Sequence, residues 1–70
     1  MNKIVFKYAG VNYELPGNAI TERYENIILP DNTTLKIESW SMGFRPQPKV
    51  YLVHHATGNA IQAKKIENLG

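Results

Sequence analysis

The segment 40–49 gathers the side chains best suited to contacting another molecule. It contains the only tryptophan of the chain, one of the two phenylalanines, a methionine and two cations. Pro46 and Pro48 stiffen the segment toward an extended conformation and remove two main-chain donors. Aromatic and arginine side chains on a rigid loop are typical of the residues that dominate binding interfaces. We therefore predict a binding site formed by Trp40, Met42, Phe44, Arg45 and Lys49.

Two other interpretations of this segment stay open from the sequence. In a core this small, Trp40 and Phe44 could instead plug the open end of a barrel, with Arg45 covering one ring in a cation–π contact. Alternatively, the two rings could stack on the bases of single-stranded nucleic acid while Arg45 and Lys49 contact phosphates. We favour another protein as the partner. Weak, salt-dependent binding of RNA or single-stranded DNA is the alternative, and a homodimer through edge strands is a third.

The residues that could support catalysis or metal binding form no recognisable set. His54 and His55 are adjacent, and adjacent side chains of a strand point to opposite faces, so the pair does not chelate one ion. Glu22 and Glu25 lie beside Arg23, with nothing to indicate a cleft between them. The serines match no nucleophile elbow, and the five glycines form no phosphate-binding loop. We predict no catalytic residue, no metal site and no cofactor.

The length and composition predict one small globular domain, residues 1–70. The chain has 70 residues, of which 43% are hydrophobic and 20% are charged. A chain of this size buries only about 60% of its surface on folding, which leaves few apolar side chains for an enzyme cleft. Because it has no cysteine, disulfides and thiolate sites are excluded and a reducing compartment is favoured. With no signal-peptide pattern and no long apolar run, we predict a cytoplasmic protein without membrane contact.

The formal net charge of +2 is unevenly distributed along the chain. Residues 1–40 carry four basic and five acidic side chains, for a net charge of −1, whereas residues 41–70 carry four basic and one acidic, for a net charge of +3. The second half therefore favours an anionic partner. It is nevertheless far from the basic stripe of a dedicated nucleic-acid-binding domain.

Turn residues recur about every ten positions, a spacing typical of short strands in an all-β domain. Apolar and polar side chains alternate over residues 3–8 and again over residues 11–15. Two alternating runs around Ala9 and Gly10 predict a β-hairpin, because a two-residue turn with glycine suits the twist of paired strands. Pro16 ends the second strand.

Residues 18–29 allow two interpretations. Ile20, Tyr24 and Ile27 fall on one helical face, with Asn18 as an N-cap. However, residues 26–29 lead directly into a turn around Pro30, and residues 34–40 then alternate as a strand does. We predict a hairpin of residues 24–29 with 34–40, preceded by a short helical turn near 18–24.

The last third of the chain is also ambiguous. Residues 49–55 are rich in β-formers and apolar on both faces as far as Val53, which is typical of a central strand. After a turn at 57–59, residues 60–65 can return antiparallel to it. A helix is the alternative over 59–69, with Asn59 as its cap, Gln62 completing a capping box and Gly70 stopping it. We predict a last strand followed by one 3₁₀ turn at 66–69.

Five short antiparallel strands predict an all-β fold with the size and layout of an SH3-like small barrel or roll. The opening sequence reads Phe6-Lys7-Tyr8-Ala9-Gly10-Val11-Asn12-Tyr13-Glu14. It resembles the Tyr-x-Gly-Val-x-Tyr hairpin that opens a group of short cyanobacterial domains of unknown function. That group has no known activity, so the resemblance implies the hairpin and nothing about function.

Overall fold

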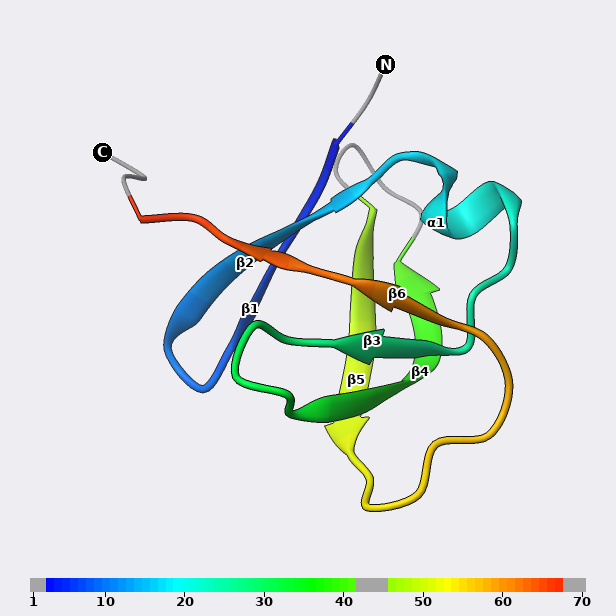
Figure 1. Ribbon diagram of the computed structural model, residues 1–70. Helices are drawn as coiled ribbons and strands as arrows, with labels where there is room; N and C mark the ends of the chain where they lie inside the picture. The colour runs from blue at the N-terminus through cyan, green and yellow to red at the C-terminus, as the bar shows by residue number, and fades with distance from the viewer. Residues whose placement is uncertain (1–2, 42–45, 68–70) are drawn as a thin grey trace.

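The computed structural model describes residues 3–41 and 46–67, which form an all-β fold with one short helix (Figure 1). The described part contains more strands than the five expected from the sequence. Its elements are β1 (Lys3–Tyr8), β2 (Val11–Pro16), α1 (Asn18–Thr21), β3 (Asn26–Ile28), β4 (Thr34–Ser41), β5 (Gln47–Leu52), β6 (Ala60–Gln62) and β7 (Lys64–Lys65).

The strands form two sheets that share the core between them. One sheet has the order β1-β2-β7 and the other the order β5-β4-β3-β6. Only Ala63 separates β6 from β7, so a single extended segment passes from one sheet to the other (Figure 1). On the opposite side, Cα atoms of β1 and β5 approach within 8 Å without ladder pairing. The described residues therefore enclose a core without forming a closed barrel.

The first hairpin confirms the prediction from alternation. In its register Ile4 lies opposite Leu15 and Phe6 opposite Tyr13, and all four side chains are buried. The rings of Phe6 and Tyr13 stack with centroids 5.5 Å apart. Ala9 and Gly10 join the strands with φ angles of 53° and 79°, and two positive φ angles are the signature of a type I′ turn.

The second hairpin, β3 with β4, is also confirmed. Its turn begins at Leu29, whose carbonyl accepts a hydrogen bond from the main-chain N–H of Asn32 at 2.8 Å. Asn32 has a φ of 71°, which asparagine tolerates better than most residues. The Thr33 N–H donates to Oδ1 of Asp31 at 3.0 Å, and the hydrogen bonds from Thr33 lower the pKa of this carboxyl.

A short helix precedes this hairpin, as predicted, but its N-cap residue differs from the one expected. The N-cap is Gly17, and Asn18 is already the first helical residue, so the expected Asn18 cap is wrong. Its side chain instead donates to Oε2 of Glu22 at 3.4 Å. The helix contributes the fully buried Ala19 to the core. It ends before Arg23, whose φ is 56°.

The predictions for the last third of the chain need correction. β5 pairs with β4 as the order requires, but it is an edge strand of its sheet and not the central strand expected. Residues 60–65 do not return antiparallel to it. β6 pairs in parallel with β3, and β7 pairs antiparallel with β2.

The alternatives for the tail are also wrong where the structure describes them. The residues that follow Asn59 are extended, so no helix begins at Asn59. Ile66 and Glu67 are not helical, and the remainder of the expected 3₁₀ turn lies outside the described residues. The Ile66 N–H donates to the carbonyl of Asn12 at 2.9 Å, which extends the pairing of β7 with β2.

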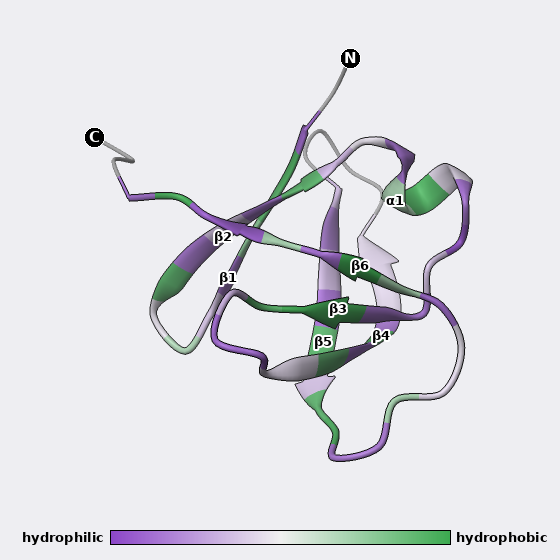
Figure 2. Ribbon diagram, in the orientation of Figure 1, coloured by the Kyte–Doolittle hydropathy of each residue, from purple (hydrophilic) through white to green (hydrophobic). Residues whose placement is uncertain are grey.

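The hydrophobic core lies between the two sheets. Figure 2 shows hydrophobic stretches on β3 and β6, whose Ile27 and Ile61 are paired across the parallel ladder. Half-buried residues, including Ile37, Trp40 and Val50, pack against the core from its margin. The buried hydrophobic residues are Ile4, Phe6, Tyr13, Leu15, Ala19, Ile27, Leu29, Leu35, Ile61 and Ala63.

The polar residue Asn26 is fully buried although it lies on the outward face of its sheet. Side chains alternate along β3, so Asn26 points away from the core that its neighbour Ile27 enters. The crossover from β5 to β6 covers it, and Asn26 Nδ2 donates to the carbonyl of Thr57 at 2.7 Å. The Asn59 carbonyl accepts hydrogen bonds from the N–H groups of both Glu25 and Asn26, each at 3.1 Å. These three bonds hold the crossover against the start of β3.

The crossover also requires a glycine at position 58. Gly58 has a φ of 94°, which side chains other than glycine rarely adopt. A Cβ atom there would lie 2.6 Å from Oε1 of Glu25, so any side chain would also displace that carboxylate.

We expect Ala9→Asn to stabilise the protein by about 0.5–1 kcal/mol and to raise the Tm by a few degrees. Asparagine accepts the positive φ of this turn more readily than alanine, as the preference for Asn-Gly in type I′ turns indicates. Thermal unfolding measures the change. Ala9→Val is the matched control and should destabilise, because a branched side chain opposes positive φ; equal Tm values for the two variants would contradict this description of the turn.

We expect Asn26→Ala to lower the free energy of unfolding by about 2–3 kcal/mol, because it leaves the Thr57 carbonyl without its donor under the crossover. Urea unfolding followed by Trp40 fluorescence measures this. Asn18→Ala is the control, since its hydrogen bond is exposed, and it should change stability by less than about 0.5 kcal/mol. A similar loss in both variants would show that the crossover does not depend on Asn26.

Candidate functional site

The structure describes two of the five predicted site residues, Trp40 and Lys49, and it does not bring them together. Trp40 lies opposite Pro48 in the β4–β5 ladder, is half-buried and packs against the core. Lys49 lies opposite Ser39 and is exposed. Successive residues of a strand point to opposite faces, so Trp40 and Pro48 face inward while Ser39 and Lys49 face outward. Met42, Phe44 and Arg45 lie outside the described residues.

The tryptophan therefore contributes to the margin of the core. Trp40 is partly buried, and Phe44, its partner in the interpretation as a plug, lies outside the described residues. Of Trp40 and Lys49, only Lys49 is exposed to solvent.

Two large hydrophobic side chains that the sequence interpretation did not single out are exposed beside this segment. Tyr51 is 46% exposed and Leu52 is 51% exposed, at the C-terminal end of β5. They follow one another, so they point to opposite faces of the sheet. Tyr51 lies opposite Lys36 on the outward face, and Leu52 lies opposite the buried Leu35 on the inward face. Together they flank one edge of the sheet.

The hydrogen-bond pattern of β5 shows which of its main-chain groups are left for a partner. The Val53 N–H donates to the carbonyl of Thr34 at 3.1 Å, which makes Val53 and Thr34 a hydrogen-bonded pair. In an antiparallel ladder such pairs alternate, so Tyr51 also bonds to β4 whereas Val50 and Leu52 point their main-chain groups away from it. Within the described residues no strand pairs with this outer side of β5.

The β4 strand confirms the same alternation from its other side. The Ile37 N–H donates to the carbonyl of Glu25 at 2.9 Å, so Ile37 is bonded toward β3 and not toward its β5 neighbour Val50. After Ile37 the register shifts, because Glu38 is inserted as a β-bulge before Ser39 resumes the pairing with Lys49. The bulge therefore separates two parts of the ladder, and the exposed Tyr51 and Leu52 lie in the part that pairs with Leu35 and Lys36.

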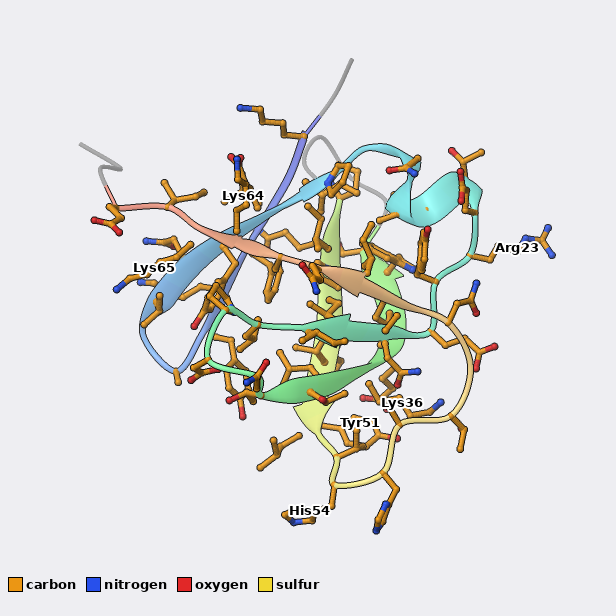
Figure 3. The ribbon with its side chains drawn as sticks, in the orientation of Figure 1. Arg23, Lys36, Tyr51, His54, Lys64 and Lys65 are labelled. Carbon is orange, nitrogen blue, oxygen red and sulfur yellow. The ribbon has the colours of Figure 1, made fainter. Side chains whose placement is uncertain are left out.

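Cations surround the exposed tyrosine. Lys36 is its direct cross-strand neighbour, and Lys49 precedes it by two residues on the same face. Figure 3 shows Lys36, Tyr51 and His54 at one end of the molecule. One carboxylate, Glu38, is exposed in the adjacent bulge. We call the surface formed by Lys36, Lys49, Val50, Tyr51 and Leu52 the β5 edge.

Two other basic residues of the second half, Lys64 and Lys65, lie elsewhere. Lys64 and Lys65 belong to β7 in the other sheet, distant from Tyr51 in Figure 3. Lys64 lies opposite Glu14 in the β2–β7 ladder. Of the lysines in residues 46–67, Lys49 therefore lies in one sheet and Lys64 and Lys65 lie in the other.

Among the described residues, no group of three or more His, Asp or Glu side chains is placed to hold a metal ion. His54 and His55 are both exposed and follow the end of β5. Within residues 3–41 and 46–67, Lys3 and Glu14 form an ion pair, with 3.7 Å between Nζ and Oε1. Both side chains are at least partly exposed.

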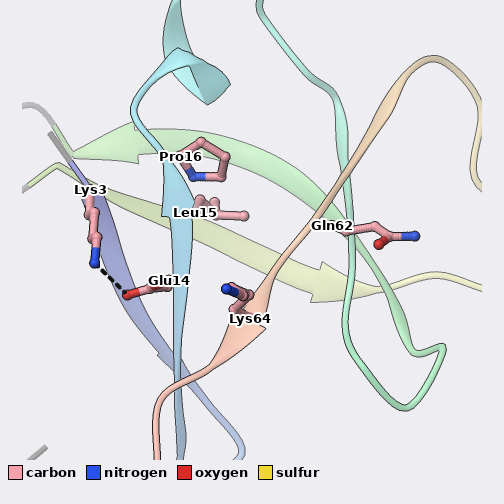
Figure 4. A pocket seen from close by; sticks show the side chains of 6 residues that line it. All are labelled: Lys3, Glu14, Leu15, Pro16, Gln62 and Lys64. Carbon is pink, nitrogen blue, oxygen red and sulfur yellow. Dashed lines mark ion pairs between the residues drawn. The ribbon is translucent and has the colours of Figure 1, made fainter. Parts of the chain in front are cut away.

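Two shallow hollows lie away from the β5 edge. One, of about 240 Å³, is lined by Lys3, Glu14, Leu15, Pro16, Gln62 and Lys64 (Figure 4). The other, of about 380 Å³, is lined by Val11, Tyr13, Pro30, Asp31 and Lys65. The Lys3–Glu14 ion pair at the rim of the first hollow is visible in Figure 4.

Comparisons with family models, with curated proteins and with solved structures found no match to this chain. Over the described residues, no helix has the length and apolar character that crossing a membrane requires. The site is therefore defined by its geometry, an exposed sheet edge with apolar side chains on both faces and cations on one.

We expect the amide protons of Val50 and Leu52 to exchange with solvent at least about tenfold faster than those of Tyr51 and Val53, because only the latter pair donates to β4. Hydrogen exchange followed residue by residue in NMR spectra measures this. The comparison is internal, since all four amides belong to one stretch of chain. Equal protection along the stretch would show that the outer side of β5 is already paired.

Proposed function

We propose that this protein is a non-catalytic binding module that contacts another protein through the β5 edge. The observation that carries the proposal is the exposure of Tyr51 and Leu52 on either side of an edge whose Val50 and Leu52 main-chain groups have no strand partner among the described residues. Exposed sheet edges bind extended segments by adding them as a further strand. Large exposed apolar side chains at such an edge are an interaction site or an aggregation liability.

The proposal modifies the prediction from the sequence in one respect. The segment 40–49 was expected to carry the contact, with neighbouring strand edges in support. The contact is now assigned chiefly to the edge just beyond that segment, with Lys49 common to both. The barrel architecture of the SH3-like type, the cytoplasmic location and the resemblance to the cyanobacterial domains stay predictions.

Binding of RNA or single-stranded DNA is the alternative function, with less support. Tyr51 between Lys36 and Lys49 has the composition of a single stacking platform. Lys64 and Lys65, which the alternative needs for phosphate contacts, belong to the other sheet. One aromatic side chain and two lysines are few for a strand of nucleic acid.

The proposal is tested by affinity capture from the lysate of the source cells with the wild type and with Tyr51→Thr/Leu52→Thr. We expect the wild type to retain proteins that the double variant loses, because threonine preserves strand propensity but removes the apolar contact. Gln62→Thr is the matched control, since Gln62 is exposed on β6, the other edge strand of the same sheet. Thermal unfolding checks that all three proteins are folded. Identical retained proteins in the double variant, or none in the wild type, would contradict the proposal.

A further inference from the structure

The open part of the β5 edge is short. Pro48 has no N–H and cannot donate to an added strand. Its side chain faces inward, but its main-chain groups point away from β4 toward the open side of β5, where proline is tolerated. Lys49 and Pro48 are the residue types that natural proteins place on edges to prevent unwanted pairing. Strand addition is therefore confined to the C-terminal part of β5, where Val50 and Leu52 each offer one N–H and one carbonyl.

An added strand would have two chemically different sides. On the inward side its residues would meet Leu52, which is half exposed at the end of the core although its cross-strand partner Leu35 is fully buried. On the outward side its residues would meet Tyr51. Because side chains of the added strand alternate as those of β5 do, apolar residues are required at every second position.

The outward side also has a charge preference. Lys36 and Lys49 flank Tyr51, and Glu38 places one carboxylate in the neighbouring bulge. The positions of an added strand that lie between the apolar ones share a face with these lysines. Lys49 is on the neighbouring strand, whereas Lys36 is one strand further away, about 10 Å from the added strand across Tyr51. Carboxylates at those positions would complement the lysines, and lysines or arginines there would be repelled.

We propose that the β5 edge binds an extended acidic segment of another protein, in which Asp or Glu alternates with Val, Ile or Leu, as an additional strand. This inference rests on the proposed function and names the chemistry of the partner. The hydrogen bonds come from Val50 and Leu52, and the apolar contact comes mainly from Leu52 and Tyr51. The selection for acidic residues comes mainly from Lys49, with Lys36 one strand further away.

A second copy of the chain fits the same edge less well. A two-fold pairing centred on Tyr51 would bring Lys36 and Lys49 of both copies onto one face, where like charges oppose association. The usable edge is also only Val50 to Leu52, and so short a strand contact lies well below the roughly 1,000 Å² that a stable interface needs. A peptide added to the edge carries no such charge conflict and can be bound transiently.

The test uses two capped peptides of about seven residues, one alternating Glu with Val and the other alternating Lys with Val. We expect the Glu peptide to slow the exchange of the Val50 and Leu52 amides and to shift their NMR signals, with the Lys peptide binding more weakly. Lys49→Glu should weaken binding of the Glu peptide about two- to fivefold and strengthen binding of the Lys peptide by a similar factor.

Two variants at one position test the main-chain contact. Leu52→Pro removes an N–H that bonds to nothing in the described part of the protein, so the sheet keeps its own ladder while the added strand loses a donor. Leu52→Thr removes the apolar side chain but keeps the N–H. We expect the proline variant to lose binding of the Glu peptide altogether and the threonine variant to retain weakened binding. Equal binding by the two variants would overturn strand addition.

Other outcomes separate this inference from the proposed function. Equal binding of the Glu and Lys peptides, or binding of neither while capture still depends on Tyr51 and Leu52, would overturn the acidic partner and leave the binding module standing. Protection of the Val50 and Leu52 amides that rises with protein concentration, together with a dimer mass in solution, would identify a second copy as the occupant instead. Signal shifts at Tyr51 with oligo(dT) but not with the Glu peptide would identify nucleic acid and also overturn the proposal.

Discussion

The side-chain hydrogen bond from Asn26 to the Thr57 carbonyl is the interaction on which the arrangement of the sheets depends. Asn26 is completely buried on the face of β3 that would otherwise meet solvent, and burying an amide is costly unless it is bonded. Its Nδ2 makes this hydrogen bond, whereas its Oδ1 has no partner among the described residues. The bond fixes the crossover against that face and delivers β6 to the far edge of the sheet, in parallel with β3. From there the Ala63 N–H reaches the carbonyl of Ile28 at 3.0 Å, and the chain continues into the second sheet. This buried hydrogen bond thus acts together with the β3–β6 ladder to place the last third of the chain.

The two hairpins could be predicted from the sequence because their determinants are local. Alternation over residues 3–15 and the turn chemistry of Ala9 and Gly10 act between neighbouring residues, and the same holds for the turn after Leu29. The pairing of Ala60–Gln62 could not be predicted, since three residues suit a parallel partner as well as an antiparallel one. The choice depends on Asn26, more than thirty positions earlier, and nothing in the sequence marks that asparagine as buried.

The candidate site was predictable only in part, for a related reason. Trp40 and Lys49 were predicted as site residues from their residue types, but the alternation of side chains along paired strands places them on opposite faces of the sheet. The apolar run Val50–Val53 indicated a central strand because hydrophobic residues on both faces usually mean burial on both. Pro48 was the contrary signal, since proline belongs at edges, and it could have identified β5 as the outer strand. The exposure of Leu52 has no local signal at all, because it follows from where the neighbouring sheet ends.

The continuous segment of β6 and β7 has a consequence for how the chain reaches its native state. The first hairpin and the second hairpin are each closed by short loops, and local closure of that kind is fast. Residues 60–65 supply the hydrogen-bonded connection between the two sheets, since they pair with β3 at one end and with β2 at the other. We therefore expect this connection to form last during synthesis, once Lys65 has emerged from the ribosome.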